Sequence, residues 1–245
     1  MKKGFFIYSM LFAVLYDLNV AAQDMVSFDD QELDQVEIVS LRVPDSAPFA
    51  VANIDAPQIR RFAHTGKELP FLLSRTPGIV AWCENGIGQG PVGMRIRGSF
   101  SERINVTLDG VVLNSPEDQM VYWANLNSYA YIVGDIQVQR GVGSSTNGGG
   151  AFGGNIAMDS KPSSTVPFLE LNASYGSYNT ANYGGSFSFG KLLNTLIVDG
   201  AFHQTRTDGF IHGTSGRSGS YYAGLTLPLE KFAVTYKNIG NYERM

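Results

Sequence analysis

The chain has 245 residues, of which 16% are charged and 44% hydrophobic, and its formal net charge is −4. Proteins that bind nucleic acid usually have a basic patch or a high isoelectric point. The net negative charge of this chain indicates neither, so no nucleic-acid partner is expected. A single cysteine, Cys83, excludes a disulfide framework within the chain.

The N-terminus has the pattern of a secretory signal peptide. Two lysines precede an apolar core at Phe5–Leu15, and the small residues Val20–Ala22 stand where signal peptidase cleaves. Asp17 interrupts the apolar run well short of the ~20 residues that a membrane-spanning helix needs. We therefore expect residues 1–22 to be removed after export.

Residues 43–160 combine helix and strand signals and predict a compact α+β domain. Residues 67–75 favour a short helix, which Pro77 ends. The sequence Leu108-Asp-Gly-Val111 predicts a β-hairpin, because Asp-Gly suits the positive φ angles of a type I′ turn. Strands are predicted at 94–97, 103–108, 134–140 and 155–159.

A glycine-rich loop, Gly141–Gly154, lies between the last two of these strands. A phosphate-binding loop of the Walker type ends in a lysine followed by serine or threonine, which this loop lacks. Its dinucleotide-like glycine spacing needs a helix directly afterwards, but residues 155–159 alternate and Pro162 follows. The loop is therefore interpreted as a connection between two strands.

From Phe168 onward, apolar residues alternate with small or polar ones at a period of two, which predicts β-strands. The second face is rich in Gly, Ser, Thr and Asn rather than in charge, as expected inside a barrel filled with water or protein. Longer and shorter connections also alternate, which is typical of transmembrane β-strands. The five predicted strands span 168–175, 183–189, 196–205, 221–227 and 232–237.

Three groups of segments, in this order, resemble the plug domain of TonB-dependent outer-membrane receptors. They are Leu72–Gly78, then Met94–Gly98 with Val106–Val111, then Ile136–Gly141 continuing through the glycine loop to Met158. The resemblance covers about residues 36–245. It implies an α+β plug domain at 43–160, followed at 161–245 by antiparallel transmembrane β-strands of an incomplete outer-membrane β-barrel, because a closed barrel needs at least about eight strands.

The resemblance further implies active transport of a scarce nutrient across a bacterial outer membrane, of the iron chelate, haem or cobalamin class. The expected partners are this ligand, outer-membrane lipid and an inner-membrane TonB-type energy-coupling protein. With about five barrel strands, the chain is expected to be an N-terminal fragment that does not transport alone. Because no Gly-x-Ser-x-Gly elbow, His-Glu-x-x-His pair or carboxylate dyad emerges, no enzymatic activity is expected.

A segment within the expected periplasmic extension, residues 23–42, resembles the TonB box of this family. Its β-prone side chains suit addition as a strand to the edge of a partner's sheet. An ordinary first strand remains the alternative interpretation. The residues expected to bind the partner are Asp34, Val36, Glu37, Ile38 and Val39.

The ligand surface is expected on the loops at 82–90, 99–103 and 114–123, from their places in the matching pattern. Aromatic side chains there are candidates for stacking on a ligand, and polar side chains are candidates for hydrogen bonds. Packing against the barrel wall or solvent exposure is the alternative for each. The candidates are Trp82, Asn85, Gln89, Phe100, Arg103, Gln119, Tyr122 and Trp123.

Three arginines, Arg95, Arg97 and Arg140, are expected to pair with barrel carboxylates and hold the plug, because buried charges need partners. His203 is expected on the inward face and His212 in a long loop, which makes a haem ligand conceivable. Lone histidines are usually not ligands, so neither a metal site nor a cofactor is expected.

The alternative function is a secreted, soluble, β-rich protein that binds a carbohydrate-type ligand through Trp82, Tyr122 and Trp123. Dependence on detergent separates the two interpretations, because a soluble binding protein stays monomeric without it.

Overall fold

The computed structural model describes residues 43, 50–142, 151–192, 195–229 and 231–245, which belong to one compact unit. The predicted signal peptide, the TonB-box-like segment and the centre of the glycine loop lie outside the described residues. In the described part, no helix is long and apolar enough to cross a membrane.

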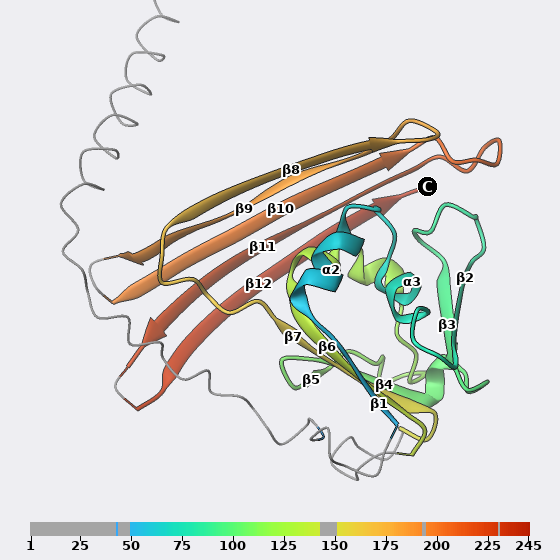
Figure 1. Cartoon of the computed structure of the whole chain (residues 1–245), viewed down its shortest axis with the longest axis horizontal. Coiled ribbons are helices and arrows are strands. Elements are labelled where there is room, and N and C mark those ends of the chain that lie inside the picture. The colour runs from blue at the N-terminus through green and yellow to red at the C-terminus, as the bar shows by residue number, and fades with distance from the viewer. Residues whose placement is uncertain (1–42, 44–49, 143–150, 193–194, 230) are drawn as a thin grey trace, which may run out of the picture. The chain divides into compact units, whose positions relative to one another are not determined.

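The N-terminal domain is built on a mixed five-stranded sheet with the strand order β1-β6-β7-β4-β5 (Figure 1). The β4–β7 pair is parallel, and the other neighbouring pairs are antiparallel. Because β6 pairs with β7, the glycine loop connects two neighbouring strands, as the sequence predicts. The bounds are β1 Val51–Ile54, β4 Ile104–Leu108, β5 Val111–Val112, β6 Val133–Arg140 and β7 Gly154–Ser160.

The tight turn between β4 and β5 confirms the predicted hairpin. Asp109 and Gly110 have φ angles of 50° and 80°, a conformation that glycine and, among other residues, aspartate tolerate best. The Asp109 carboxylate accepts a hydrogen bond from Ser160 N at 2.9 Å. The turn is thereby tied to the end of β7.

Two short helices follow β1 in the chain and pack into the domain core. Helix α2, Ala56–Ala63, begins at Asp55, whose carboxylate accepts a hydrogen bond from Gln58 N at 3.0 Å. Such a cap satisfies a backbone donor that the first helical turn leaves unpaired. Helix α3, Leu69–Leu73, confirms the predicted helix in a shorter form.

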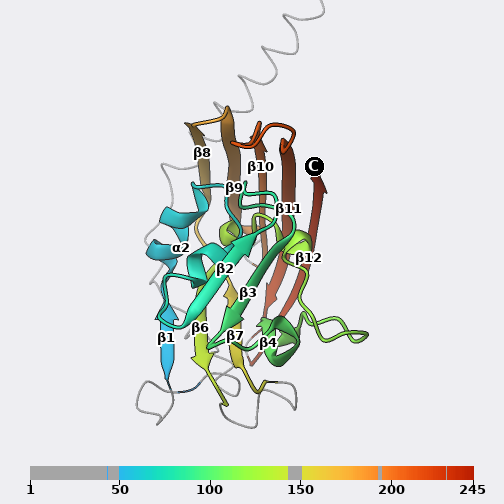
Figure 2. The same cartoon turned by 90° about the vertical axis from the view of Figure 1, so that its right-hand side faces the viewer.

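A separate antiparallel hairpin, β2 with β3, lies beside the mixed sheet (Figure 2). Short 3₁₀ turns carry the chain onward from it. The bounds are β2 Ile79–Cys83, β3 Val92–Ile96, η1 Ser101–Arg103, η2 Trp123–Leu126 and η3 Tyr129–Tyr131.

The hydrophobic core of the N-terminal domain is formed by its helices, its hairpin and its mixed sheet. Leu73, Ile96 and Ile156 come from these three sources, and none of them has exposed side-chain surface. Removal of apolar surface from water contributes roughly 25 cal/mol per Å² and dominates the stability of such a core. The domain therefore has a core of its own.

The remaining strands form a second, antiparallel sheet with the order β12-β11-β10-β9-β8, which we call the strand sheet (Figure 1). All five predicted strands are confirmed, and most are longer than predicted. Within the described residues this sheet is open, with β8 and β12 at its edges. The bounds are β8 Phe168–Gly176, β9 Thr180–Leu192, β10 Leu196–Thr207, β11 Gly216–Pro228 and β12 Ala233–Arg244.

The two faces of the strand sheet differ as the alternation predicts. Leu169 and Leu171 on the outward face are each 71% exposed. Asn182, Thr205 and Ser218 on the inward face are buried, and each bonds a residue of the N-terminal domain or of a neighbouring strand. An exposed apolar face opposite a small polar face is the pattern of a membrane-spanning barrel wall, whose outward residues contact lipid.

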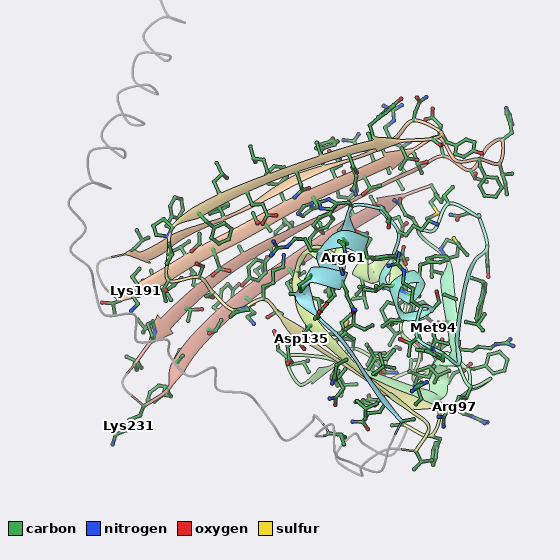
Figure 3. The ribbon with its side chains drawn as sticks, in the orientation of Figure 1. Arg61, Met94, Arg97, Asp135, Lys191 and Lys231 are labelled. Carbon is green, nitrogen blue, oxygen red and sulfur yellow. The ribbon has the colours of Figure 1, made fainter. Side chains whose placement is uncertain are left out.

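The connections of the strand sheet lie alternately at its two ends, and the predicted alternation of longer and shorter connections is seen only in 208–215, which is longer than the others described. The connections 177–179 and 208–215 lie at one end, called the loop end, and 229–232 lies at the other, called the turn end. Lys191 and Lys231 project at the turn end (Figure 3). Long cationic side chains at such positions reach from an apolar band towards water.

Candidate ligand-binding surface and plug–strand interface

Both parts of the chain contribute to the surface at the loop end. The loop 84–91, which joins β2 to β3, lies against the connection 208–215. Phe210 packs beside Gly86, and Ile87 packs beside Gly216. A ligand at this end of the sheet therefore meets residues from both.

Two predicted ligand residues, Asn85 and Gln89, shape the loop 84–91. The Asn85 amide oxygen accepts a hydrogen bond from Ile87 N at 3.1 Å, and its Nδ2 donates to the Gln89 carbonyl at 3.0 Å. The Gln89 side chain is buried, and its Nε2 donates to the Gly66 carbonyl at 2.8 Å. Their polar atoms thus hold the loop in place.

An exposed aromatic and cationic patch lies on the β2–β3 hairpin and the start of η1, and we call it the hairpin face: Trp82, Arg95 and Phe100. The Arg95 guanidinium lies 5.4 Å from the Trp82 ring centroid and 3.9 Å from that of Phe100. Trp82 is 38% exposed and Phe100 is 52% exposed. A guanidinium stacked on aromatic rings keeps its planar N–H donors for an anionic group. The hairpin face can therefore bind a ligand that is both flat and negatively charged.

The loop 114–123 is held by Asn114, which bonds three backbone groups. Its Oδ1 accepts from Val106 N at 2.8 Å, and its Nδ2 donates to the carbonyls of Ile104 at 2.9 Å and Gln119 at 2.7 Å. These bonds fix the loop to strand β4.

Two of the predicted ligand residues on the loop 114–123 are exposed, and one is not. Tyr122 is exposed and donates its hydroxyl hydrogen bond to Asp118, which lowers the pKa of that carboxyl. Gln119 is also exposed. Trp123 is only 2% exposed, because η2 turns its indole into the domain core. Arg103, at the end of η1, is exposed.

Of the three arginines predicted to pair with barrel carboxylates, two make other contacts in the described residues and the third is exposed. Arg95 stacks on the hairpin face, and Arg140 Nη1 donates to the Pro77 carbonyl at 2.9 Å. Arg97 is exposed at the far end of the β2–β3 hairpin from the loop 84–91 (Figure 3). Pairing of these arginines with carboxylates stays a prediction.

An ion pair that the sequence analysis missed joins the strand sheet to the N-terminal domain. Lys237 Nζ on β12 lies 2.8 Å from Asp109 Oδ2 and also bonds Ser160. Burial raises the pKa of Asp109, but the bonds from Lys237 and Ser160 outweigh it and hold the pKa below its usual value. The available signal was a lysine on the small, polar face of a predicted strand.

A second contact between the two parts centres on Tyr131. Its hydroxyl donates to the Ala63 carbonyl at 2.9 Å and accepts from Asn182 Nδ2 at 2.9 Å. The His203 ring stacks on the Tyr131 ring, with centroids 3.3 Å apart and planes 8° apart. His203 faces inward as predicted, and in the structure it packs against the N-terminal domain. His212 lies exposed in the connection 208–215.

A buried carboxyl group, Glu68, lies near β12. Its side chain is 3% exposed, and Oε1 accepts a hydrogen bond from Gly90 N at 2.6 Å. Burial raises the pKa of Glu68 to about 8; the Gly90 bond opposes this shift, and repulsion from Glu243 adds to it. The folded protein thus binds a proton here at neutral pH.

Stability is therefore expected to fall as the pH rises. The pKa of Glu68 in the folded state, about 8, exceeds its ordinary value of 4.5, so the proton's contribution is complete below the ordinary value and is lost as the pH rises through 8. Each pH unit in that window changes the unfolding free energy by up to about 1.4 kcal/mol. Melting in detergent should show this slope, and Glu68→Gln should flatten it. Glu102→Gln, at an exposed carboxylate, is the control; an unchanged slope in Glu68→Gln refutes the assignment.

Residues 43–155 match the model of the TonB-dependent receptor plug domain. No curated protein sequence matches the chain.

Among solved structures, the ferripyoverdine receptor FpvA of Pseudomonas aeruginosa, bound to heterologous pyoverdines, is similar with a TM-score of 0.63 and 15% identity over 82% of this chain and 26% of that one. The FrpB iron transporter of Neisseria meningitidis has a TM-score of 0.62 and 16% identity over 80% of this chain and 32% of that one. The siderophore receptor PiuA of Acinetobacter baumannii has a TM-score of 0.61 and 20% identity over 80% of this chain and 27% of that one.

The chain thus spans between about a quarter and a third of the length of these receptors. At these identities the structural likeness shows the fold, and the plug model identifies the family of the domain at residues 43–155. The mixed sheet with its short helices is the plug, and the strand sheet corresponds to the barrel strands that follow it. The chain therefore carries the plug domain of the TonB-dependent receptor family, followed by antiparallel strands of an incomplete outer-membrane β-barrel.

Proposed function

We propose that the chain is the plug and first barrel strands of an outer-membrane receptor that actively takes up an iron chelate of the siderophore class. The observation that carries this proposal is the plug's polar contact with one face of a sheet whose other face is apolar and exposed. A sheet of that kind suits a lipid-facing barrel wall. The role is transport, without catalysis.

The relatives support the ligand class. FpvA has been solved with pyoverdine, FrpB is an iron transporter and PiuA is a siderophore receptor. Transfer of this ligand class to the present chain is part of the proposal. So is the coupling of uptake to an inner-membrane TonB-type protein through the segment around Val36 and Ile38, in a protein exported with a cleaved signal peptide.

The ligand is proposed to bind at the hairpin face together with the exposed part of the loop 114–123. Trp82 and Phe100 offer apolar ring faces, and Arg95 between them offers a positive charge. Ferric chelates built from catecholate groups combine flat rings with negative charge, which matches both features. Arg103, Gln119 and Tyr122 are the proposed polar contacts around this centre. Asn85 and Gln89 support the loop, and Trp123 supports the core.

Tryptophan fluorescence provides the test, because Trp82 is exposed and Trp123 is buried. The 245-residue chain in detergent is titrated with ferric complexes of a tris-catecholate, a tris-hydroxamate and citrate. One of these three classes of ferric complex is expected to bind and to quench the tryptophan emission in a saturable manner. Trp82→Phe should remove most of the response, whereas Trp123→Phe should keep it. Arg95→Gln is expected to weaken binding about tenfold, equivalent to about 1.4 kcal/mol.

Two results would count against the ligand site. Saturable binding that survives unchanged in both Trp82→Phe and Arg95→Gln would place the ligand elsewhere. Failure of all three ferric complexes to bind, while the chain remains folded by circular dichroism, would reject the iron-chelate class.

A further inference from the structure

Three arginines stand side by side on the outward face of the strand sheet at the loop end. Arg206 on β10 is the cross-strand partner of Arg217 on β11, and Arg217 is the partner of Arg244 on β12. All three side chains are exposed. We call them the arginine row.

Such an arrangement is unfavourable without an anion. Directly opposed residues on antiparallel strands have their Cβ atoms about 5 Å apart, and like charges at this separation destabilise the pair. The arginine row places two such pairs next to each other. An anion that accepts hydrogen bonds from neighbouring guanidinium groups converts the repulsion into attraction.

The Gln204 amide, which two neighbouring tyrosines contact, holds the central arginine, Arg217. Tyr183 and Tyr242 lie one outward-facing row nearer the sheet centre, and their hydroxyls contact the Gln204 amide. With its oxygen turned towards Arg217, that amide accepts from Nε at 2.9 Å and from Nη2 at 2.8 Å. Half-exposed tyrosines on a barrel wall mark the level of the membrane interface. The arginine row therefore lies at the depth of lipid headgroups.

The three arginines line an open surface hollow of about 370 Å³. Asp208 is the acidic residue among its lining groups, and its Oδ2 accepts a hydrogen bond from Asn179 Nδ2 at 2.7 Å. One side-chain carboxylate against three guanidinium groups gives the lining side chains a net positive charge. At the turn end, by contrast, Lys191 lies on β9 and Lys231 lies in the connection 229–232, and the two are not cross-strand partners.

We propose that the arginine row binds the phosphorylated headgroup of a lipid in the outer leaflet, an inference that rests on the proposed outer-membrane location. Planar guanidinium groups bind phosphate oxygens in a bidentate manner, so three in register suit a headgroup with more than one phosphate. The lipid's acyl chains then lie along the apolar outward face below the row. The bound lipid stabilises the loop end of the sheet, next to the connection 208–215.

Native mass spectrometry of the 245-residue chain in dodecyl maltoside micelles tests the proposal. The probes are lipid A with two phosphates, the same lipid after dephosphorylation, and inorganic phosphate. Lipid A is expected to bind at one site, and the other two probes are not. Arg206→Gln/Arg217→Gln/Arg244→Gln should weaken lipid A binding by about 100-fold, given the strength of charge-assisted hydrogen bonds. Lys191→Gln/Lys231→Gln is the matched control and should bind as the unaltered chain does.

Equal binding of lipid A to the triple arginine variant and to the unaltered chain overturns the proposal, as does an equal loss in the lysine control. Inorganic phosphate that displaces lipid A indicates a free-anion site and also overturns it. The chelate titration of the triple arginine variant separates this outcome from the proposed function. Because the arginine row lies on the outward face, that titration should be unchanged.

Discussion

Without detergent, a polypeptide of residues 43–161 is expected to remain monomeric and to melt cooperatively, whereas residues 23–245 are expected to aggregate. The buried apolar cluster lies wholly between Ile54 and Met158, so the plug keeps its core when the strand sheet is removed. The strand sheet instead exposes large apolar side chains and has two open edges at β8 and β12. Long, unpaired edges template association with other chains.

Size-exclusion chromatography and circular dichroism of both polypeptides provide the comparison. The longer one in dodecyl maltoside is the control, and detergent should keep it dispersed by covering the outward face. A detergent-free, monomeric, cooperatively melting 23–245 polypeptide would contradict the barrel assignment. It would favour the secreted carbohydrate-type binding protein instead.

Replacement of Asp109 by alanine is expected to destabilise the plug and its contact with β12 by about 2–3 kcal/mol, since hydrogen bonds to charged groups contribute about 1.5–3 kcal/mol each when well formed. The carboxylate accepts from Ser160 N at 2.9 Å and pairs with Lys237 at 2.8 Å, so alanine removes both contacts and leaves Ser160 as the partner of Lys237. Alanine also tolerates the φ angle of 50° less well than aspartate does. The partial exposure of the ion pair keeps the effect below that of a fully buried one.

Chemical denaturation of the chain in detergent measures this effect. Asp109→Asn keeps the size, the turn conformation and an acceptor for Ser160 N, so it should lose less than half as much. Equal midpoints for Asp109→Ala and the unaltered chain would show that the contact with Lys237 contributes no stability.

The strands were predictable from sequence because their alternation is local. Leu169 and Leu171 alternate with polar residues whatever the rest of the chain does, and the structure places both outward. The Asp-Gly turn was predictable for the same reason, since its φ requirement resides in two residues. The strands extend further than predicted because pairing with a neighbour, such as β12 with β11 as far as Arg244, carries polar residues along.

Other elements were harder to predict, because their sequence signals are short or because they form only through contacts with distant segments. Helix α2 has only eight residues, and its start signal, Asp55 followed by Pro57, is too short to predict a helix by itself. Strand β2 turns Ile79 and Ala81 to the core but carries apolar Val80 and Trp82 on its exposed face, so its sequence shows no alternation of apolar and polar residues. Short elements of this kind are fixed by tertiary contacts more than by propensity.

The site residues also divide into those that a local sequence pattern predicts and those that depend on tertiary contacts. Aromatic and arginine residues near Trp82 were predictable as a group, but the stacking of Arg95 on Phe100 depends on how η1 folds back towards β3. The burial of Trp123 and the stacking of His203 on Tyr131 depend on packing between distant segments. No local pattern encodes such pairs.

The alternation of lipid-facing and plug-facing residues along the strand sheet tests the central claim most directly. Single cysteines are placed at the adjacent pairs Leu171/Asn172 and Leu225/Thr226, in a Cys83→Ser background, and labelled with bimane. The 245-residue chain is then transferred to brominated dodecyl maltoside, which quenches fluorophores in contact with detergent tails. Labels at 171 and 225 should be strongly quenched, and labels at 172 and 226 should be protected beneath the plug. Equal quenching within both pairs would contradict a barrel wall with a plug on its inner face.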